Sequence, residues 1–470
     1  MKKSVKLMMA LVSCALLSSV VSCGGTTSDD GGKDCPVCPD SGDKVGGKVL
    51  NIWAWNDEFQ GRLRQFYPDY VSTDANGNDL LRDGTTIKWT IHANDNNGYQ
   101  VPLDEALKNQ ESAATDDKID MFLSEADYIT KYKDSDYTLD VKKDVGITDD
   151  YLSDQYKYTQ QVATSSDGAL KGVTWQATPG LYAYRTDLAE KVFGTSDPDK
   201  VQAKLADWSK FNAAAKTAKD AGVKILSGYD DAYRTYSNNV SKPWVDDKGV
   251  VSIDPMIKKW VDDTMVNVKN GYCGDTTLWS SGWQSDQGPK GNVLGFFYST
   301  WGINFTLLGN SLDAGNTKHE LGNGLFGKYR VCEGPASYYW GGTWMHACKG
   351  TDNIPEIKDI MEKLTCSRTV ESSITRVTED YTNTVSGMHA IATDDTYASA
   401  FLGGQNHVAL FEASASKIDA SKMSAYDQGC NENFQTAMHD YFAGKATYEE
   451  ALANFKKLLT AKYPEVTYDF

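Results

Sequence analysis

The succession of strand-like and helix-like segments constrains the fold of this chain more than any other feature. Residues 49–55 (VLNIWAW) predict a first strand, and residues 85–92 (TTIKWTIH) alternate with the period of two that is typical of a half-buried strand. Shorter apolar runs predict further strands at 119–123, 181–184 and 223–226. Polar turns and helical patterns separate these segments, so neighbouring strands are not simple hairpins.

Helix start signals lie between and after the strands. Asp207 can cap one helix, and a second helix starts after Asp254 with a proline at its first position. Thr447 and Glu450 form a capping box in front of a third helix. The chain has 470 residues, which is enough for one large or two ordinary domains. We therefore predict an α/β architecture with two sheets in two lobes.

The N-terminus has the pattern of an export signal. Three lysines precede an apolar run at 7–17 that is too short to span a bilayer, so residues 1–22 predict a signal peptide. The run ends in Val-Val-Ser-Cys, which resembles the bacterial lipobox and implies that Cys23 becomes a lipidated mature N-terminus. A plain signal peptide with a chance cysteine is the alternative. We expect an extracytoplasmic protein that contacts the bacterial cell membrane through its lipid anchor only.

A flexible tether is predicted to follow the anchor. Residues 23–47 are rich in glycine, aspartate, serine and proline, and such a segment cannot offset its own ordering entropy. Cys35 and Cys38 form a CxxC that could be half of a zinc site or a redox pair. No second CxxC completes a metal site, so a local disulfide or two idle thiols is the favoured interpretation.

Charge and motif content exclude several functions. The net charge is −17, and after residue 22 the chain carries 64 acidic against 44 basic residues, which repels nucleic acid. There are only six histidines and no GxSxG or HExxH motif, so we predict no catalytic residue, no metal and no cofactor. Residues 322–328 match GxGxxG, but Tyr329 replaces the Ser or Thr of a P-loop, which favours a surface loop.

Tryptophans fall where predicted strands end. In open α/β sheets, ligands gather at the carboxyl ends of strands, so we expect these rings at one cleft. A sugar packs its C–H-rich face on an aromatic ring and presents hydroxyls to carboxylates and amides. The predicted ring residues are Trp55, Trp175, Trp301 and Trp340, and the predicted polar neighbours are Asn56, Asp57, Glu125 and Asp127. Each ring has a core position as its alternative, which is favoured for Trp53 and Trp260 because both lie on predicted apolar stripes. For Glu125 and Asp127, which follow a predicted buried strand, a surface turn is the alternative.

Five segments resemble, in their order along the chain, the extracellular solute-binding proteins of carbohydrate ABC importers (family 1, maltose-binding-protein-like). They are VLNIWAWNDEF, IDMFLSEADYITKY, LKGVTWQATPGLYAYRTDL, WGGTWMHACKGTDNIPEIKDIMEKLT and YFAGKATYEEALANF. The resemblance implies a two-lobed periplasmic-binding-protein-like fold whose crossing segments act as a hinge. It implies an N-lobe of residues 48–176 and 343–384 and a C-lobe of residues 177–342 and 385–470.

The resemblance also implies a function and further site residues. A protein of this family is a monomeric, non-enzymatic capture protein that binds a carbohydrate between its lobes and delivers it to the permease subunits of the importer. The number of candidate rings suggests an oligosaccharide. By position, the resemblance adds Glu58 beside the first strand, and it adds Asp231 and Tyr233 as an acid and a stacking ring of the second lobe. The sequence departs from the family pattern at Trp175 and Gln176, where the family usually has Leu-Pro.

Three other functions remain open at this point. A secreted glycan-degrading enzyme would use Asp231 and a partner acid, although no second carboxylate at glycosidase distance is visible in the sequence. A surface adhesin would bind glycan without serving an importer. A peptide or polyamine cargo would suit the same two-lobed fold, but the aromatic strand ends favour a sugar.

Overall fold

The computed structural model describes residues 48–470. The predicted signal peptide (1–22), the lipidation site Cys23, the tether (23–47) and the CxxC lie outside the described residues.

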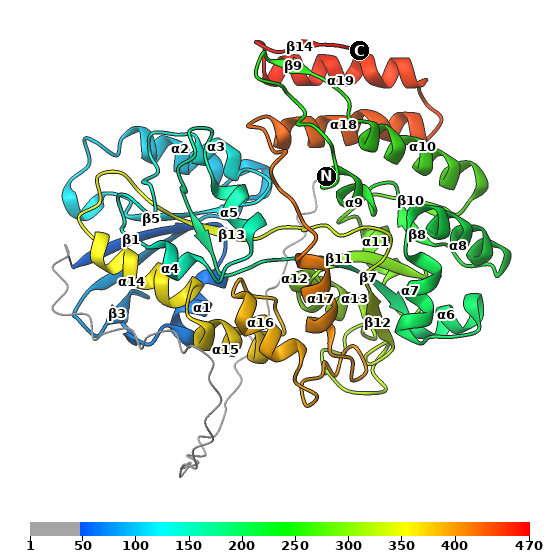
Figure 1. Cartoon of the computed structure of the whole chain (residues 1–470), viewed down its shortest axis with the longest axis horizontal. Coiled ribbons are helices and arrows are strands. Elements are labelled where there is room, and N and C mark those ends of the chain that lie inside the picture. Colours follow the sequence, from blue (N-terminus) through cyan, green and yellow to red (C-terminus); the bar gives the residue numbers. More distant parts are fainter. Residues whose placement is uncertain (1–47) are drawn as a thin grey trace, which may run out of the picture. The chain divides into compact units, whose positions relative to one another are not determined.

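A seven-stranded mixed sheet forms the first lobe (Figure 1). Its strands in spatial order are β2 (Tyr70–Thr73), β3 (Asp79–Leu81), β4 (Thr86–Ile91), β1 (Val49–Ala54), β5 (Met121–Glu125), β13 (Thr343–Ala347) and β6 (Val173–Thr174). Strand β1 is parallel to both β4 and β5, whereas β13 is antiparallel to β5 and β6. The central strands β1 and β5 therefore end at the same edge, which places the residues that follow them close together.

Helices cover both faces of this sheet. Alternate residues of β5 point to opposite faces, so Met121 and Leu123 join one buried cluster and Phe122 joins the other. The helices on the Met121 side are α1 (Glu58–Phe66), α14 (Ile354–Thr365) and α15 (Arg368–Thr378), and those on the Phe122 side are α2 (Gln100–Lys108) and α3 (Ile129–Lys133) (Figure 1). Shorter elements are η1 (Asp95–Asn97), η2 (Thr115–Asp117), α4 (Asp149–Leu152) and α5 (Lys157–Ala163).

The second lobe is built on smaller sheets. Strand β7 (Gly180–Arg185) is antiparallel to β11 (Gly295–Ser299) on one side and to β12 (Tyr329–Cys332) on the other, and β8 (Leu226–Gly228) is parallel to β10 (Cys273–Thr276). Its helices before residue 312 are α6 (Thr186–Phe193), α7 (Pro198–Leu205), α8 (Trp208–Asp220), α9 (Tyr233–Ser237), α10 (Pro255–Asn270), α11 (Ser281–Asp286), α12 (Thr300–Gly302) and α13 (Leu308–Ser311). A π-helical turn, η3 (Ile303–Leu307), joins α12 to α13.

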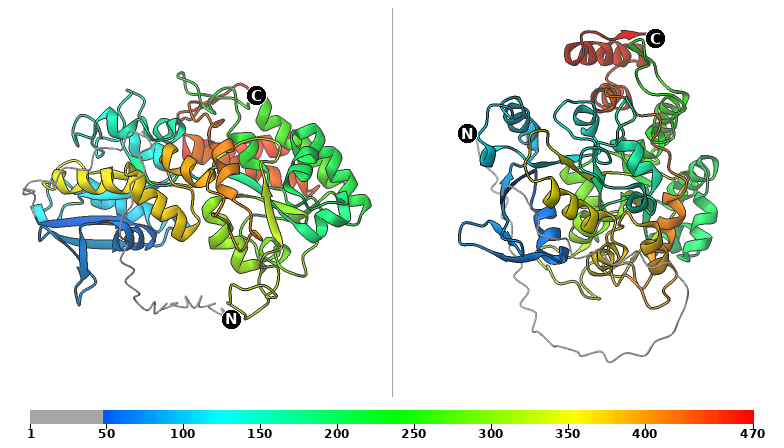
Figure 2. Two further views of the ribbon diagram at one scale, coloured as in Figure 1. Left: turned by 60° about the horizontal axis from the view of Figure 1, so that its bottom comes forward. Right: turned by 60° about the vertical axis from the view of Figure 1, so that its left-hand side comes forward.

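The C-terminal part returns to the second lobe. Its elements are α16 (Val385–Ala392), α17 (His407–Ala415), α18 (Asp427–Phe442), α19 (Tyr448–Lys462) and β14 (Thr467–Tyr468). Helices α18 and α19 pack on each other and α18 packs on α10, as Figures 1 and 2 show. Strand β14 pairs in parallel with β9 (Val250–Val251), so the last residues of the chain are joined to its middle.

Three segments cross between the lobes side by side: the first crossing is residues 175–179, the second is residues 333–342 and the third is residues 379–384. The central one, residues 175–179, pairs with residues 379–384 through the Gln176–Thr382 bridge and with residues 333–342 through the Pro179–Tyr339 bridge. Backbone hydrogen bonds join the central segment to both neighbours, for example from Ala177 N–H to the Tyr381 carbonyl (3.1 Å). Such paired crossings are where a two-lobed protein bends.

Most sequence-based expectations for the elements are confirmed. Asp207 caps α8 by accepting a hydrogen bond from Lys210 N–H, and Thr447 and Glu450 form both bonds of the predicted capping box. Two strands are displaced along the chain: the one expected at 119–123 spans Met121–Glu125, and the one expected at 223–226 spans Leu226–Gly228. Periodicity marks a strand, but its ends depend on which partner strand is present.

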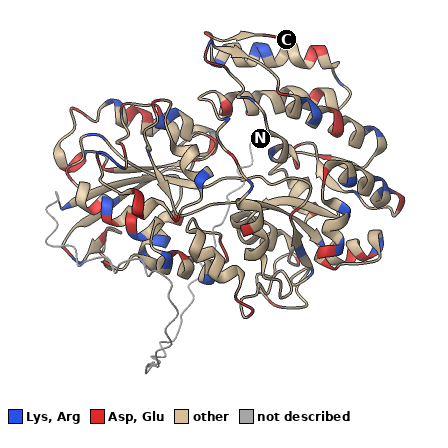
Figure 3. Ribbon diagram, in the orientation of Figure 1, with Lys and Arg blue, Asp and Glu red and all other residues tan. Residues whose placement is uncertain are grey.

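Charged residues of both signs are interspersed along the helices of the described part (Figure 3). Several pair at helical spacing, such as Lys216 with Asp220 and Lys258 with Asp262. Within residues 48–470, none of the helices combines the length and the apolar character that crossing a bilayer requires.

Candidate functional site

The candidate site is built around two tryptophans at the second crossing. Trp301 lies in α12, directly after β11, and Trp340 lies in the crossing segment 333–342. Trp301 Nε1 donates to the Trp340 carbonyl (2.7 Å), and the two ring centres are 5.4 Å apart in a T-shaped arrangement. A side chain at Gly341 would place its Cβ 2.7 Å from Trp301 Nε1, so this close approach requires glycine. The structure thus brings together two of the predicted ring residues.

A third tryptophan, which the sequence analysis missed, completes this aromatic cluster. Trp279 lies between β10 and α11, and its ring is stacked beside Trp301 (6.3 Å, 15°) and edge-on to Trp340 (5.9 Å, 62°). Trp279 is 49% exposed and Trp301 is half-buried, whereas Trp340 is only 6% exposed and stacks on Tyr298. Trp279 does not follow an apolar run, so its neighbours in the sequence give no signal for a ligand-binding ring.

Charged side chains lie against the buried ring of this cluster. The Arg234 guanidinium, on α9, sits 5.2 Å from the centre of the Trp340 ring. It makes a two-fold contact with Asp127, at 2.9 and 2.7 Å between nitrogen and oxygen atoms. Asp127 follows β5 of the first lobe, so this pair joins the two lobes. The Asp127 charge raises the pKa of Arg234 against the opposing effect of burial.

Glu125 is the second predicted carboxylate in this region. Its Oε2 accepts a hydrogen bond from the Asp127 N–H (2.7 Å). Burial raises the pKa of Glu125 to about 8, the neighbouring Asp127 charge adds to the effect, and Arg234 opposes it. Glu125 can therefore exchange a proton near neutral pH and can donate as well as accept hydrogen bonds.

Trp55 continues the site on the first lobe. It follows β1, is half-buried, and lies edge-on to Tyr128 (6.1 Å) and Tyr99 (5.9 Å). Asn56 and Asp57 next to it are exposed, and Asn56 Oδ1 accepts a hydrogen bond from the Glu58 N–H (3.1 Å). A continuous path of contacts therefore runs from Trp55 through residues 125–128 and Arg234 to Trp340.

Tyr233 and Asp231, the two predicted site residues of the second lobe, are buried and are hydrogen-bonded to other residues of that lobe. Tyr233 is 3% exposed, its ring is edge-on to Trp260, and its hydroxyl donates to Asn431 Oδ1 (2.5 Å). Asp231 Oδ2 accepts hydrogen bonds from the N–H groups of Ser227 (2.7 Å) and Gly228 (3.1 Å) and so holds the turn after β8. Burial raises the pKa of Asp231 to about 7, while these two hydrogen bonds lower it.

The structure does not bring Trp175 to this surface. The ring is 1% exposed and stacks on Phe59 of α1 (5.2 Å, 25°), inside the core of the first lobe. Trp175, which was expected to add a stacking ring, is therefore a core residue in this structure, and Trp260 is buried as well. Trp175 is buried because Phe59, on a helix more than a hundred residues earlier in the chain, covers its ring.

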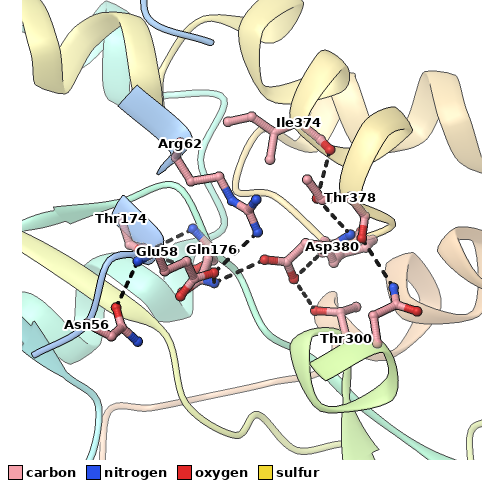
Figure 4. Close-up of polar contacts among 11 residues, drawn as sticks. Asn56, Glu58, Arg62, Thr174, Gln176, Thr300, Ile374, Thr378 and Asp380 are labelled. Carbon is pink, nitrogen blue, oxygen red and sulfur yellow. Dashed lines mark hydrogen bonds and ion pairs between the residues drawn. The ribbon is translucent and has the colours of Figure 1, made fainter. Parts of the chain in front are cut away.

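A polar cluster lies beneath the site at the first crossing (Figure 4). Gln176 Nε2 donates to Glu58 Oε1 (2.9 Å) and to Asp380 Oδ2 (3.0 Å), so two carboxylates share one amide group. Asp380 Oδ1 accepts from the Thr300 hydroxyl (2.7 Å), directly before Trp301. Burial raises the pKa of Glu58 to about 7, Arg62 lowers it, and the Asp380 charge raises it again. The cluster ties two crossings to the segment that carries Trp301.

A cavity of about 150 Å³ is lined in part by the Arg234–Asp127 pair. Its walls include Tyr233, Tyr339 and Met423, together with the carboxylates of Asp230 and Asp427. Asp230 Oδ1 is hydrogen-bonded to His439 Nε2 (2.7 Å). Within residues 48–470, no group of three or more His, Cys, Asp or Glu side chains is arranged to hold a metal ion.

Comparison with known proteins gives a match in structure. No protein-family model and no curated protein sequence matches the chain. A crystal structure of an extracellular solute-binding protein of family 1 matches with a TM-score of 0.67 at 17% identity, covering 87% of this chain and 99% of that one. The chain has the fold of an extracellular solute-binding protein. The predicted two-lobed α/β fold is therefore confirmed.

Two other proteins with the solute-binding-protein fold were solved with sugars. The ABC transporter associated binding protein from B. animalis subsp. lactis, in complex with β-1,6-galactobiose, has a TM-score of 0.62 at 16% identity and covers 90% of this chain and all of its own. The galacto-N-biose-/lacto-N-biose I-binding protein of the ABC transporter from Bifidobacterium longum, in complex with lacto-N-biose, has a TM-score of 0.61 at 15% identity, with 90% and 98% covered.

Proposed function

We propose that this chain is the substrate-binding component of a carbohydrate ABC importer, and not an enzyme. It captures a sugar, in chain form, between its lobes and delivers it to the permease subunits. The observation that carries the proposal is that partly exposed rings and carboxylates follow strands of both lobes and are joined by one path of contacts. The rings are Trp55 and Trp301, and the carboxylates are Glu125 and Asp127, linked through Tyr128, Arg234 and Trp340. The sugars bound by two proteins of the same fold, β-1,6-galactobiose and lacto-N-biose, support it.

The lobe boundaries are part of the proposal. The N-lobe comprises residues 48–176 and 343–384, and the C-lobe comprises residues 177–342 and 385–470. Sheet membership supports this division, because every strand of the seven-stranded sheet falls in the first set and β7, β11 and β12 fall in the second. A monomer held at the outer face of the membrane by a lipid on Cys23 completes the proposal, and the lipobox-like sequence supports it.

The contacts of the ring residues explain how a sugar is held. The Trp301 ring is fixed by its hydrogen bond to the Trp340 carbonyl, so its face is preorganised for the apolar side of a sugar ring. Glu125, Asp127 and Arg234 offer acceptors and donors for hydroxyls beside the same cluster. Asp231, the candidate acid of a glycan-degrading enzyme, is engaged by Ser227 and Gly228 and has the role of a turn residue.

A calorimetric thermal-shift screen of the purified full chain against mono- and oligosaccharides tests the function. A sugar at 100 times its dissociation constant stabilises the folded state by about 2.7 kcal/mol, so the melting temperature rises. Chromatography after incubation shows whether the sugar is intact. An intact sugar with a raised melting temperature is the expected result, and a consumed sugar would establish the enzyme instead.

Variants connect the binding to the site. Trp301→Ala is expected to weaken sugar binding at least several-fold, because a buried stacking contact is worth about 0.5–1.5 kcal/mol beyond its area. Tyr70→Ala, on the edge strand β2, is the matched control and is expected to leave affinity unchanged. If Trp301→Ala and Trp55→Ala both bind normally, the site is elsewhere. If the protein binds only polymeric glycan, and its radius of gyration in solution scattering does not decrease on binding, it is an adhesin.

A further inference from the structure

Trp279 has a backbone conformation that a tryptophan rarely adopts. Its φ is +68°, in the left-handed region that is costly for a bulky side chain. It is the third residue of a turn closed by a hydrogen bond from Ser280 N–H to the Thr277 carbonyl (3.2 Å), a position where glycine or asparagine is usual. Strain of this kind persists where the side chain has a function.

The Trp279 ring belongs to a row of three aromatic rings, two of them exposed and one half-buried. The half-buried ring, Trp301, contacts both of the others, and its centre is 6.3 Å from the ring centre of Trp279 and 6.3 Å from that of Phe305. Phe305 is 79% exposed and Trp279 is 49% exposed. Apolar side chains with such exposure, gathered on one surface, mark an interaction site.

Neighbouring residues support two of the three rings, Trp279 and Trp301. Trp279 rests edge-on against the buried ring of Trp283 (5.4 Å) and against Trp340. Trp301 and Phe305 are four residues apart across the start of the π-helical turn η3, a local irregularity that is common at functional sites. Trp279 and Trp301 are therefore held in place by neighbouring rings before a ligand arrives, which lowers the entropy cost of binding.

The occupant that suits the row is a chain of sugar units. Arg234 and Asp127 are linked to the row through Trp340, so apolar rings and hydrogen-bonding groups lie near one another. A sugar chain also combines C–H faces with hydroxyls. A purely apolar partner would desolvate the Arg234–Asp127 pair without offering it any further hydrogen bond.

We propose that Trp279, Trp301 and Phe305 hold successive units of one glycan chain, so that the protein selects chains of three or more units over shorter sugars. Trp279 is the residue that sets this preference. Its left-handed backbone conformation is strained, and this strain accompanies the placement of its ring in the row. The inference rests on the proposed function and deepens it, because it states the length of sugar that the site prefers.

Isothermal titration calorimetry of the full chain with size series of malto-, cello-, xylo-, manno- and β-1,6-galacto-oligosaccharides, from one to six units, tests the inference. Trp279→Gly removes the ring and suits the positive φ, so the variant should fold at least as stably as the natural protein. We expect its affinity for chains of three or more units to fall about 2- to 10-fold, with monosaccharide affinity unchanged. Trp279→Phe should restore most of the preference.

Each other outcome overturns the inference in a recognisable way. Equal losses for short and long sugars would make Trp279 a general support of the site, and no loss would remove it from the site. If the natural protein binds no sugar of any length, the proposed function falls together with the inference. If sedimentation shows a dimer that Trp279→Gly converts to a monomer, the row is a self-association surface. Phe305→Ala is the matched variant at the other end and should give the same dependence on length.

Discussion

At the scale of single residues, the most consequential contact is the amide that two carboxylates share. Gln176 donates to both Glu58 and Asp380, and Arg62 is the cation that faces Glu58. Burial is the main reason why the pKa of Glu58 rises; the Arg62 charge lowers it, and the nearby Asp380 charge raises it further. The groups that face Glu58 are Asp57, Arg62, Gln176 and Asp380.

Glu58→Gln is expected to change how stability depends on pH. The unfolded chain loses the Glu58 proton near the ordinary value of 4.5, but the folded chain keeps it to about pH 7. Between these values the folded state binds more protons, so the free energy of unfolding falls as pH rises. The variant keeps the acceptor oxygen and removes the titration, so this fall should be shallower and stability at pH 8 should increase by about 1–2 kcal/mol.

Urea titrations at pH 5, 6, 7 and 8 measure this effect. Glu449→Gln, at the exposed start of α19, is the matched control and should reproduce the natural profile. Glu125 and Asp231 also have raised pKa values, so some fall with pH remains in the Glu58 variant. An unchanged slope between pH 5 and 7 would show that Glu58 does not titrate there.

The residue scale is also where sequence-based prediction reaches its limit. Trp301 and Trp175 have similar local surroundings in the sequence, yet Trp301 is accessible and Trp175 is in the core. What separates them is Phe59, whose ring covers Trp175 from a distant helix. Trp279 was missed for the opposite reason, because its neighbours in the sequence form no apolar strand and its partners come from two other segments.

At the scale of elements, the C-terminal end of α15 stores strain beside the third crossing. Glu379 follows this helix with φ +57°, and its N–H donates to the Thr375 carbonyl (2.8 Å). Helices often end in this left-handed conformation, but glycine is the residue that adopts it without a steric penalty. Glu371 supports the same crossing, since its Oε2 accepts hydrogen bonds from the N–H groups of Asn383 and Thr384.

Glu379→Gly is expected to stabilise the protein. Relief of the left-handed penalty exceeds the entropy that glycine adds to the unfolded chain, and the net gain should be about 0.5–1 kcal/mol. Scanning calorimetry should show a higher melting temperature. Glu432→Gly, within α18, is the matched control, and there the same exchange should cost about 1 kcal/mol. A lower melting temperature for Glu379→Gly would mean that the Glu379 side chain contributes more than its backbone costs.

Helices and strands could be predicted from the sequence where the residues that define them are close together in the chain. The caps of α8 and α19 are formed by side chains within three residues of the helix start, so spacing alone reveals them. The strand β8 is short and displaced because its pairing partner, β10, comes from nearly fifty residues later. The crossings were expected from a family resemblance, but their side-by-side pairing depends on three distant segments.

At the scale of the whole molecule, one ion pair joins the lobes next to the site. Arg234 and Asp127 are both partly exposed, so their pair is worth about 0.2–1 kcal/mol. Small as it is, this energy is comparable with the difference between two arrangements of lobes that move on a hinge. The pair therefore biases the conformation that the unliganded protein adopts.

Arg234→Gln is expected to favour arrangements in which the lobes are farther apart. The ratio of separated to joined forms should rise by up to about 5-fold, which follows from a pair worth at most about 1 kcal/mol. Small-angle X-ray scattering without ligand should give a larger radius of gyration, and high salt should move the natural protein in the same direction. Arg64→Gln breaks a two-fold contact with Asp79 inside the first lobe and should leave the radius unchanged.

The aromatic cluster has an optical consequence. The ring centres of Trp279, Trp301 and Trp340 lie 5.4–6.3 Å from one another, close enough for their excited states to couple. Coupled indoles give paired bands of opposite sign in far-ultraviolet circular dichroism, where indole absorbs most strongly. Their emission responds to any molecule that displaces water from the two accessible faces. The unlabelled protein should thus report its own occupancy by light, in real time and at concentrations far below those that calorimetry needs.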